Sequence, residues 1–163
     1  MDPRKRFQFP PFVINLMIPL FFGVLGGLIT INSVRTWYPG IQKPSWNPPN
    51  WLFGPVWSTL FIIIGISAYL VWRKRDKIVH FPRTVAIYFI QLVLNLVWSY
   101  LFFYHHMIGA ALIEIFALLV AIVINGIMFY KIDKTAGILF IPYFLWVSFA
   151  AFLTYNIFIL NQV

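Results

Sequence analysis

The sequence predicts an all-α integral membrane protein, a bundle of five transmembrane helices. Of its 163 residues, 61% are hydrophobic and only 10% are charged, against about 25% charged residues in an ordinary soluble domain. A soluble domain of this size leaves much of its surface in water and could not hide so much apolar surface. The composition therefore excludes a soluble enzyme, a disordered tail and a nucleic-acid-binding module. The chain has no cysteine, which excludes disulfides and thiolate metal sites.

Long stretches without charged residues place the helices. A helix needs about 20 apolar residues to cross a bilayer, and the stretch from 84 to 130, with Glu114 as its only charge, is long enough for two crossings. A polar break at His105 and His106 divides it. Apolar residues hardly alternate, so a membrane β-barrel is not favoured, and the first apolar run is too long for a cleaved signal peptide. The five helices are expected at about 11–34, 51–73, 83–104, 107–130 and 135–160, within a single domain of residues 1–163.

The basic residues predict the orientation. Ten of the twelve Lys and Arg residues precede the first helix or lie between the second and third or the fourth and fifth helices. Only Arg35 and Lys43 fall on the other side. The positive-inside rule therefore predicts a cytoplasmic N-terminus and a C-terminus outside. Nucleic-acid binding explains these clusters poorly, because they sit at helix ends without a supporting domain.

The connection at 35–50 is longer than the others and has an unusual composition. Four prolines and a glycine prevent a continuous helix, and Trp37, Tyr38 and Trp46 make it aromatic. One interpretation is an ordered lid over the outer end of the bundle, since prolines lower the entropy lost on ordering. The alternative is an interfacial belt, where Trp and Tyr commonly lie at headgroup level. The interleaving of aromatic residues with prolines favours the lid.

Small, polar and aromatic residues recur at helical spacing, so each helix has one face suited to the interior. Close packing accounts for the small residues, and the pair Gly23 and Gly27 forms a weak GxxxG motif for packing or dimerisation. Packing accounts less well for Trp57, Trp98 and Trp146, because indole is bulky and its N–H needs a partner when buried. We therefore expect an aromatic cavity below the 35–50 connection that holds a flat apolar ligand. The polar groups that could orient this ligand are Asn95, Gln91 and Tyr38.

Other chemistry-bearing residues give weaker indications. Glu114 is the one acid within a predicted span, and a structural or hydrogen-bonding role is favoured over proton coupling because no second acid accompanies it. His105 and His106 are adjacent and point apart, so no metal site is expected. The sequence contains no nucleophile–base pair or phosphate-binding loop. Arg83, Tyr88 and Leu92 fit an inverted sterol-contact pattern, which is weak evidence for a sterol.

Several segments together resemble the tryptophan-rich sensory protein and translocator protein family, also called the TspO/MBR or peripheral-type benzodiazepine receptor family. The most specific is the stretch from Lys43 to Trp57, KPSWNPPNWLFGPVW, which resembles the family's first loop and the start of its second helix. LNLVWS at 94–99 and PYFLWVSFAA at 142–151 resemble the signatures of the third and fifth helices. Thr154 departs from the pattern, where the family usually has Asn.

This resemblance implies a five-helix receptor or sensor, often dimeric, that binds tetrapyrroles such as protoporphyrin IX and haem. It also implies binding of isoquinoline and benzodiazepine drugs, with no obligatory cofactor. Some bacterial members are reported to degrade protoporphyrin in light, which would make residues Trp57 and Trp146 redox-active; tetrapyrrole or sterol transport is a further alternative. The expected partners are an aromatic ligand and the bilayer, and the expected location is a bacterial plasma membrane. The ligand contacts carried over by the resemblance are Tyr38, Pro44, Trp57, Asn95, Trp98, Trp146 and Ala150.

Overall fold

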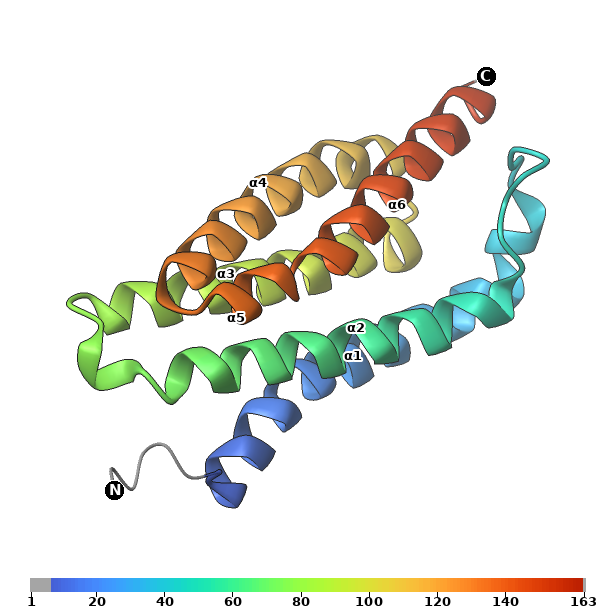
Figure 1. Cartoon of the computed structure of the whole chain (residues 1–163). Coiled ribbons are helices and arrows are strands. Elements are labelled where there is room, and N and C mark those ends of the chain that lie inside the picture. The colour runs from blue at the N-terminus through green and yellow to red at the C-terminus, as the bar shows by residue number, and fades with distance from the viewer. Residues whose placement is uncertain (1–6, 163) are drawn as a thin grey trace.

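The computed structural model describes residues 7–162 and is helical throughout its spans (Figure 1). Five segments are long and apolar enough to cross a membrane. The last two helices below together form the fifth of these spans. The helices are α1 (Phe9–Thr36), α2 (Asn50–Trp72), α3 (Phe81–Ser99), α4 (Ile108–Ile132), α5 (Lys134–Ile138) and α6 (Ile141–Leu160).

The helices form a bundle in which neighbours in sequence are mostly neighbours in space. α1 packs on α2 and α3, α4 packs on α3 and α6, and α5 packs on α2 and α4. The segments at 73–80 and 131–134 lie at one end, which we call the basic end, and the 37–49 connection lies at the other, which we call the loop end (Figure 1). Arg4, Lys5 and Arg6, which contributed to the predicted orientation, lie outside the described residues.

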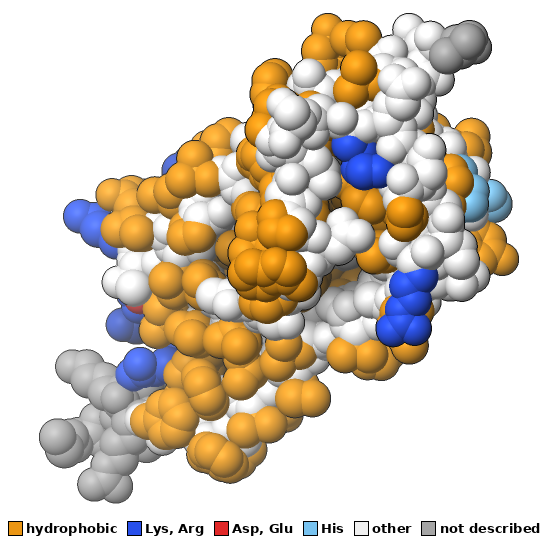
Figure 2. Space-filling model, turned by 90° about the vertical axis from the view of Figure 1, so that its right-hand side faces the viewer, with side chains coloured by type: hydrophobic (Ala, Val, Ile, Leu, Met, Phe, Trp, Pro, Cys, Tyr) orange, Lys and Arg blue, Asp and Glu red, His pale blue; other side chains and the backbone are white. Residues whose placement is uncertain are grey.

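Large apolar side chains cover the outer surface of the bundle. Phe21 and Leu28 on α1, Ile113 and Val120 on α4, and Leu145 on α6 are each more than half exposed. Figure 2, which views the loop end, shows hydrophobic side chains over much of the visible face and only isolated Lys and Arg groups. Such a surface is stable in contact with lipid and not with water.

A proline and a glycine bring α1 and α2 close together. Pro19 in α1 has no N–H and cannot bond the carbonyl of Asn15 one turn earlier. Gly65 of α2 lies against this position: a Cβ there would stand 3.0 Å from the Asn15 oxygen and 2.8 Å from the Cα of Leu16. The absence of a side chain therefore allows the two backbones to approach, as in other membrane helix pairs.

The fifth predicted helix, expected as one element at 135–160, is broken in the structure. α5 ends at Ile138, and Leu139 and Phe140 form a turn before α6 begins. Pro142 gives the physical reason, because it lacks the N–H that would bond the carbonyl of Ile138, and its ring disfavours helical geometry at the preceding residue. The single-helix prediction was wrong in this respect, although the two helices still form one span.

Asp133 joins the basic ends of α2 and α5. Its Oδ1 accepts a hydrogen bond of 3.1 Å from the N–H of Ala136, which caps α5, and its Oδ2 lies 2.8 Å from Nζ of Lys74. Burial alone would raise the pKa of Asp133. The hydrogen bonds from Lys74 and Ala136 and the charge of Lys74 outweigh burial, so the pKa lies below its ordinary value.

This lowered pKa predicts a loss of stability in acid. Because the folded-state pKa lies below the unfolded one, the carboxylate stabilises the fold fully above about pH 4 and ceases to do so as the pH falls through the folded-state pKa. The thermal unfolding midpoint in detergent is expected to fall more steeply below about pH 4 for the native chain than for Asp133→Asn, which keeps a capping oxygen and does not titrate. Parallel profiles would show that Asp133 contributes nothing through its charge.

Candidate ligand-binding site

A cavity of about 340 Å³ lies between α1, α2 and α3. Its walls are largely apolar, with the indole rings of Trp57 and Trp98 among them and the amide of Asn95 beside them. α1 contributes mainly small residues, which leave room for a guest. The lining residues are Leu20, Phe22, Gly23, Val24, Gly26, Gly27 and Thr30 from α1, Phe53, Gly54, Trp57, Ser58 and Phe61 from α2, and Asn95, Trp98, Ser99 and Phe103 from α3 and the turn after it.

Trp98 combines a fixed ring with an unused hydrogen-bond donor. Its indole stacks on Phe102 with ring centroids 5.3 Å apart and meets Phe103 edge to face at 5.9 Å. Its Nε1 is buried and has no hydrogen-bond partner within residues 7–162. A buried N–H without a partner is costly.

Asn95 and Trp57 are both held by Tyr143 of α6. The Nδ2 of Asn95 donates to the Tyr143 hydroxyl at 3.2 Å, and both side chains are buried. The Trp57 ring stacks on Phe61 at 5.7 Å and contacts the edge of Tyr143 at 6.4 Å. These contacts limit the rotamers of two cavity residues, which lowers the entropy lost when a ligand binds.

Trp146 lies one contact away from the cavity. Its indole packs edge to face against Phe53 at 5.9 Å and in a tilted arrangement against Phe149 at 5.4 Å. Phe53 lines the cavity, and Trp146 does not. Its Nε1 is also buried without a hydrogen-bond partner in the described chain. The structure therefore brings together only two of the three indoles that the sequence placed around one cavity.

The loop between α1 and α2 is folded across the loop end with Tyr38 buried beneath it. The Tyr38 ring contacts Phe103 at 5.8 Å, and its hydroxyl donates to Asn47 Oδ1 at 2.8 Å. Burial raises the pKa of Tyr38 to about 12, against the opposing effect of the Asn47 hydrogen bond, so the phenol stays neutral at physiological pH. Lys43 donates to the carbonyls of Tyr38 and Ile41 at 2.6 and 2.7 Å and is used within the loop.

Contacts with α6 and with the turn after α3 hold the loop in place. Trp46 stacks on Phe152 of α6 at 5.3 Å, and Trp37 stacks on His106 at 4.1 Å. Asn161, just after α6, makes two hydrogen bonds with the backbone of Gln42, at 3.0 and 2.9 Å. The loop thus spans from the end of α1 to the end of α6, and none of its residues lines the cavity between α1, α2 and α3.

Loss of the Asn161 side chain is expected to loosen this loop. Two hydrogen bonds at about 1 kcal/mol each, or about 2 kcal/mol together, predict roughly 30-fold faster amide hydrogen exchange in residues 41–47 for Asn161→Ala. Gln162→Ala is the matched control, because Gln162 is exposed and its side chain has no such contact with the loop. Equal exchange in the two variants would show that the aromatic stacking alone holds the loop.

The turn after α3 is a π-helix, Tyr100–Tyr104, a form often found at functional sites. It places Phe103 in the cavity wall and Phe102 beneath Tyr38. Ser33 of α1 donates to the Phe103 carbonyl and lies 3.2 Å from Nε2 of His106. His106 therefore joins α1, the loop and the turn.

The remaining predicted residues are placed away from the cavity. Gln91 is fully buried and its amide has no hydrogen-bond partner among the described residues. Ala150 belongs to the core, and Pro44 lies in the loop, where its carbonyl accepts from the N–H of Asn47 at 3.0 Å. Glu114 has both carboxylate oxygens buried without a partner in the same described range, so the expected hydrogen bonding is not seen there. Tyr88 and Leu92 of the sterol-contact pattern are also buried.

The sequence analysis did not predict that α1 forms one wall of the cavity, or that Phe53 of α2 lines it. The signal was present, because Gly23, Gly26, Gly27 and Thr30 recur at helical spacing on one face. We interpreted the glycines as packing residues, and Gly23 does lie against Phe61. Gly27, however, has no other atom within 4 Å of the position where a Cβ would stand.

Comparison with known proteins identifies the family. The TspO/MBR family model matches residues 15–160, nearly the whole chain. The chain belongs to the TspO/MBR family. It is 40% identical over 149 residues to tryptophan-rich protein TspO of Archaeoglobus fulgidus, covering 91% of this chain and 95% of that one. It is 31% identical over 157 residues to the translocator protein of Sus scrofa, covering 93% and 90% of the two chains.

Other relatives extend this range. Tryptophan-rich sensory protein of Cereibacter sphaeroides is 30% identical over 125 residues, covering 77% of each chain. Membership of the TspO/MBR family and the five spans agree with the apolar outer surface. This TspO/MBR protein is therefore an integral membrane protein.

Proposed function

We propose that this TspO/MBR protein is a membrane receptor or sensor that binds tetrapyrroles, such as protoporphyrin IX and haem, in the cavity between α1, α2 and α3. One observation carries the proposal: Trp57 and Trp98 line a single cavity. In addition, the indole N–H of Trp98 is buried and has no partner among the described residues. Flat aromatic ligands stack on such rings. Isoquinoline and benzodiazepine drugs share this chemistry and are the other ligands we propose.

The size and the polar groups of the cavity support a ligand-binding role. Its volume of about 340 Å³ falls within the range of known ligand sites, about 300–1,000 Å³. Asn95 and Ser99 add polar atoms to the α3 wall, and Thr30 adds a hydroxyl on α1. Arg35, exposed at the end of α1, is the cation available near the loop end for a porphyrin carboxylate, since Lys43 is occupied.

A variant that fills the cavity tests the location. Gly26 lies on the α1 wall with Ser99 Oγ 3.6 Å from the position of a Cβ, so Gly26→Leu would place four carbons in the cavity. Protoporphyrin IX, titrated against tryptophan fluorescence in detergent, is expected to bind at least about tenfold more weakly. Gly40→Leu is the control, because Gly40 has open space and lies outside the cavity. Equal affinities for both variants would place the ligand elsewhere.

A second proposed function is light-dependent breakdown of protoporphyrin, and the location of Trp57 supports it. Trp57 lines the cavity, where an indole could exchange electrons with a bound porphyrin, whereas Trp146 reaches it only through Phe53. Under illumination, loss of porphyrin absorbance should then slow in Trp57→Phe and persist in Trp146→Phe. If porphyrin absorbance is lost at the same rate in both variants and in the native chain, neither tryptophan takes part in the reaction.

The setting we propose is a homodimer in a bacterial plasma membrane, with the basic end in the cytoplasm. The cations at 73–83 and 131–134 support this orientation through the positive-inside rule. The exposed apolar side chains of α1, such as Ile14, Phe21 and Leu28, offer a face on which a second copy could pack. Gly23 is used within the protomer, against Phe61, so the GxxxG motif does not supply this face.

A further inference from the structure

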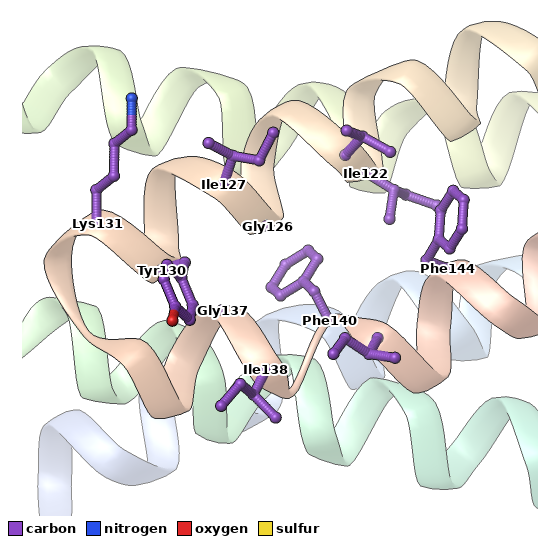
Figure 3. A pocket seen from close by; sticks show the side chains of 11 residues that line it. Ile122, Gly126, Ile127, Tyr130, Lys131, Gly137, Ile138, Phe140 and Phe144 are labelled. Atoms are coloured by element: carbon purple, nitrogen blue, oxygen red, sulfur yellow. The ribbon is translucent and has the colours of Figure 1, made fainter.

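A second hollow lies on the outer face of the bundle, between α4 and the α5–α6 segment, away from the proposed ligand cavity. Its volume is about 340 Å³ and it is open to the surroundings of the helices. Figure 3 shows Phe140 directed toward Gly126 at its centre, with Tyr130 and Lys131 at one end and Phe144 at the other. We call it the α4–α6 groove, and it also includes Ile122, Val123, Ile127, Gly137, Ile138 and Ile141.

The break between α5 and α6 and two glycines create this groove. Gly137 of α5 lies so close to α4 that a Cβ would stand 2.5 Å from the Cα of Tyr130. Gly126 faces Phe140: a Cβ added at Gly126 would stand 3.3 Å from the Cβ of Phe140. Phe140 is buried and forms the floor, whereas Ile127 and Ile138 on the rim are 52% and 53% exposed. An apolar groove open on a membrane-spanning surface accepts an acyl chain.

The end of the groove at Lys131 carries an unpaired positive charge. Lys131 has no hydrogen bond or ion pair with any of residues 7–162, and the nearby Asp133 is occupied by Lys74 at 2.8 Å. Lys131 lies at the basic end of the span, where lipid headgroups meet water.

We propose that the α4–α6 groove is a binding site for an anionic phospholipid, with an acyl chain along Phe140 and Phe144 and the headgroup at Lys131. Charge complementarity selects this occupant, since basic groups at the membrane surface attract anionic headgroups. A second copy of the chain is the alternative occupant, and the groove-filling variant below distinguishes it from lipid. A water-soluble ligand would leave its polar groups unpaired on the apolar walls.

Native mass spectrometry of the full chain in detergent, with phosphatidylglycerol or phosphatidylcholine added, tests the headgroup part of the proposal. Phosphatidylglycerol is expected to bind at lower concentration than phosphatidylcholine, and Lys131→Gln is expected to weaken phosphatidylglycerol binding roughly fivefold and phosphatidylcholine binding less. Lys134→Gln is the matched control, because Lys134 is exposed and outside the groove lining. Equal losses in the two variants would indicate general charge attraction and overturn the site.

A groove-filling variant tests the acyl-chain part. Ile127→Trp places an indole in the groove and is expected to weaken binding of both phospholipids severalfold. Val120→Trp, on the same helix, 60% exposed and outside the groove, is expected to bind both as the native chain does. The proposal fails if Ile127→Trp binds lipid normally, or if it converts dimers to monomers with lipid binding unchanged, which would assign the groove to a second copy.

Discussion

Replacing Trp57 or Trp98 with alanine is expected to weaken protoporphyrin IX binding by roughly 30-fold each, and replacing Trp146 by less than about threefold. Buried aromatic residues at the centre of a binding site typically contribute about 2 kcal/mol or more, which corresponds to that factor. Trp57 and Trp98 line the cavity, whereas Trp146 contacts only its wall residue Phe53. The three variants therefore distinguish the tryptophans that line the cavity from one that only shares an interior helix face with them.

The measurement must separate lost contacts from lost folding. Absorbance of the bound porphyrin reports binding without depending on the tryptophans removed, and the thermal midpoint of each variant in detergent reports the fold. Trp98→Phe is an informative addition, because it keeps an aromatic ring beside Phe102 and removes the unpartnered N–H together with part of the ring area. An equal loss at all three tryptophans would place the ligand nearer α6 than the cavity lies. Unchanged binding in Trp57→Ala and Trp98→Ala would refute the proposed site.

Gly137→Ala is expected to have the largest effect on stability among the small substitutions. A Cβ at Gly137 would stand 2.3, 2.5 and 2.7 Å from Cβ, Cα and N of Tyr130, and two of these are backbone atoms that cannot rotate away. Forcing α5 away from α4 is expected to cost about 2 kcal/mol, or roughly 4–8 °C in the thermal midpoint. The strain would also move Phe140 and alter the α4–α6 groove.

Gly27→Ala is the matched control for Gly137→Ala. Gly27 lies within α1 and nothing stands within 4 Å of its Cβ position. Alanine also favours the helix over glycine by about 1 kcal/mol, so the midpoint of this variant should stay constant or rise. A midpoint for Gly137→Ala equal to that of the native chain would show that α5 shifts freely and that the close approach is not required for folding.

Local sequence patterns were sufficient for the spans and for two of the three indoles. The number of spans follows from the runs of apolar residues. Unpaired charges and backbone groups without hydrogen bonds are both costly in lipid, so each span is a helix without charged residues on its lipid-facing side. Helical spacing also placed Trp57, Trp98 and Asn95 on interior faces, and all three line the cavity. Pro142 indicates the break before α6. The apolar run continues on both sides of this proline, however, and therefore predicted a single helix.

What the sequence by itself determined is which segments cross the membrane and which face of each is suited to the interior, because both depend on periodicity and on the cost of polar groups in lipid. Only the tertiary structure decided which faces meet. The kink-prone Pro19 against Gly65 brings α1 onto α2, so the glycines of α1 became a cavity wall, and Phe53 came to stand between that cavity and Trp146. Such arrangements depend on contacts between residues far apart in the chain, which no local pattern encodes.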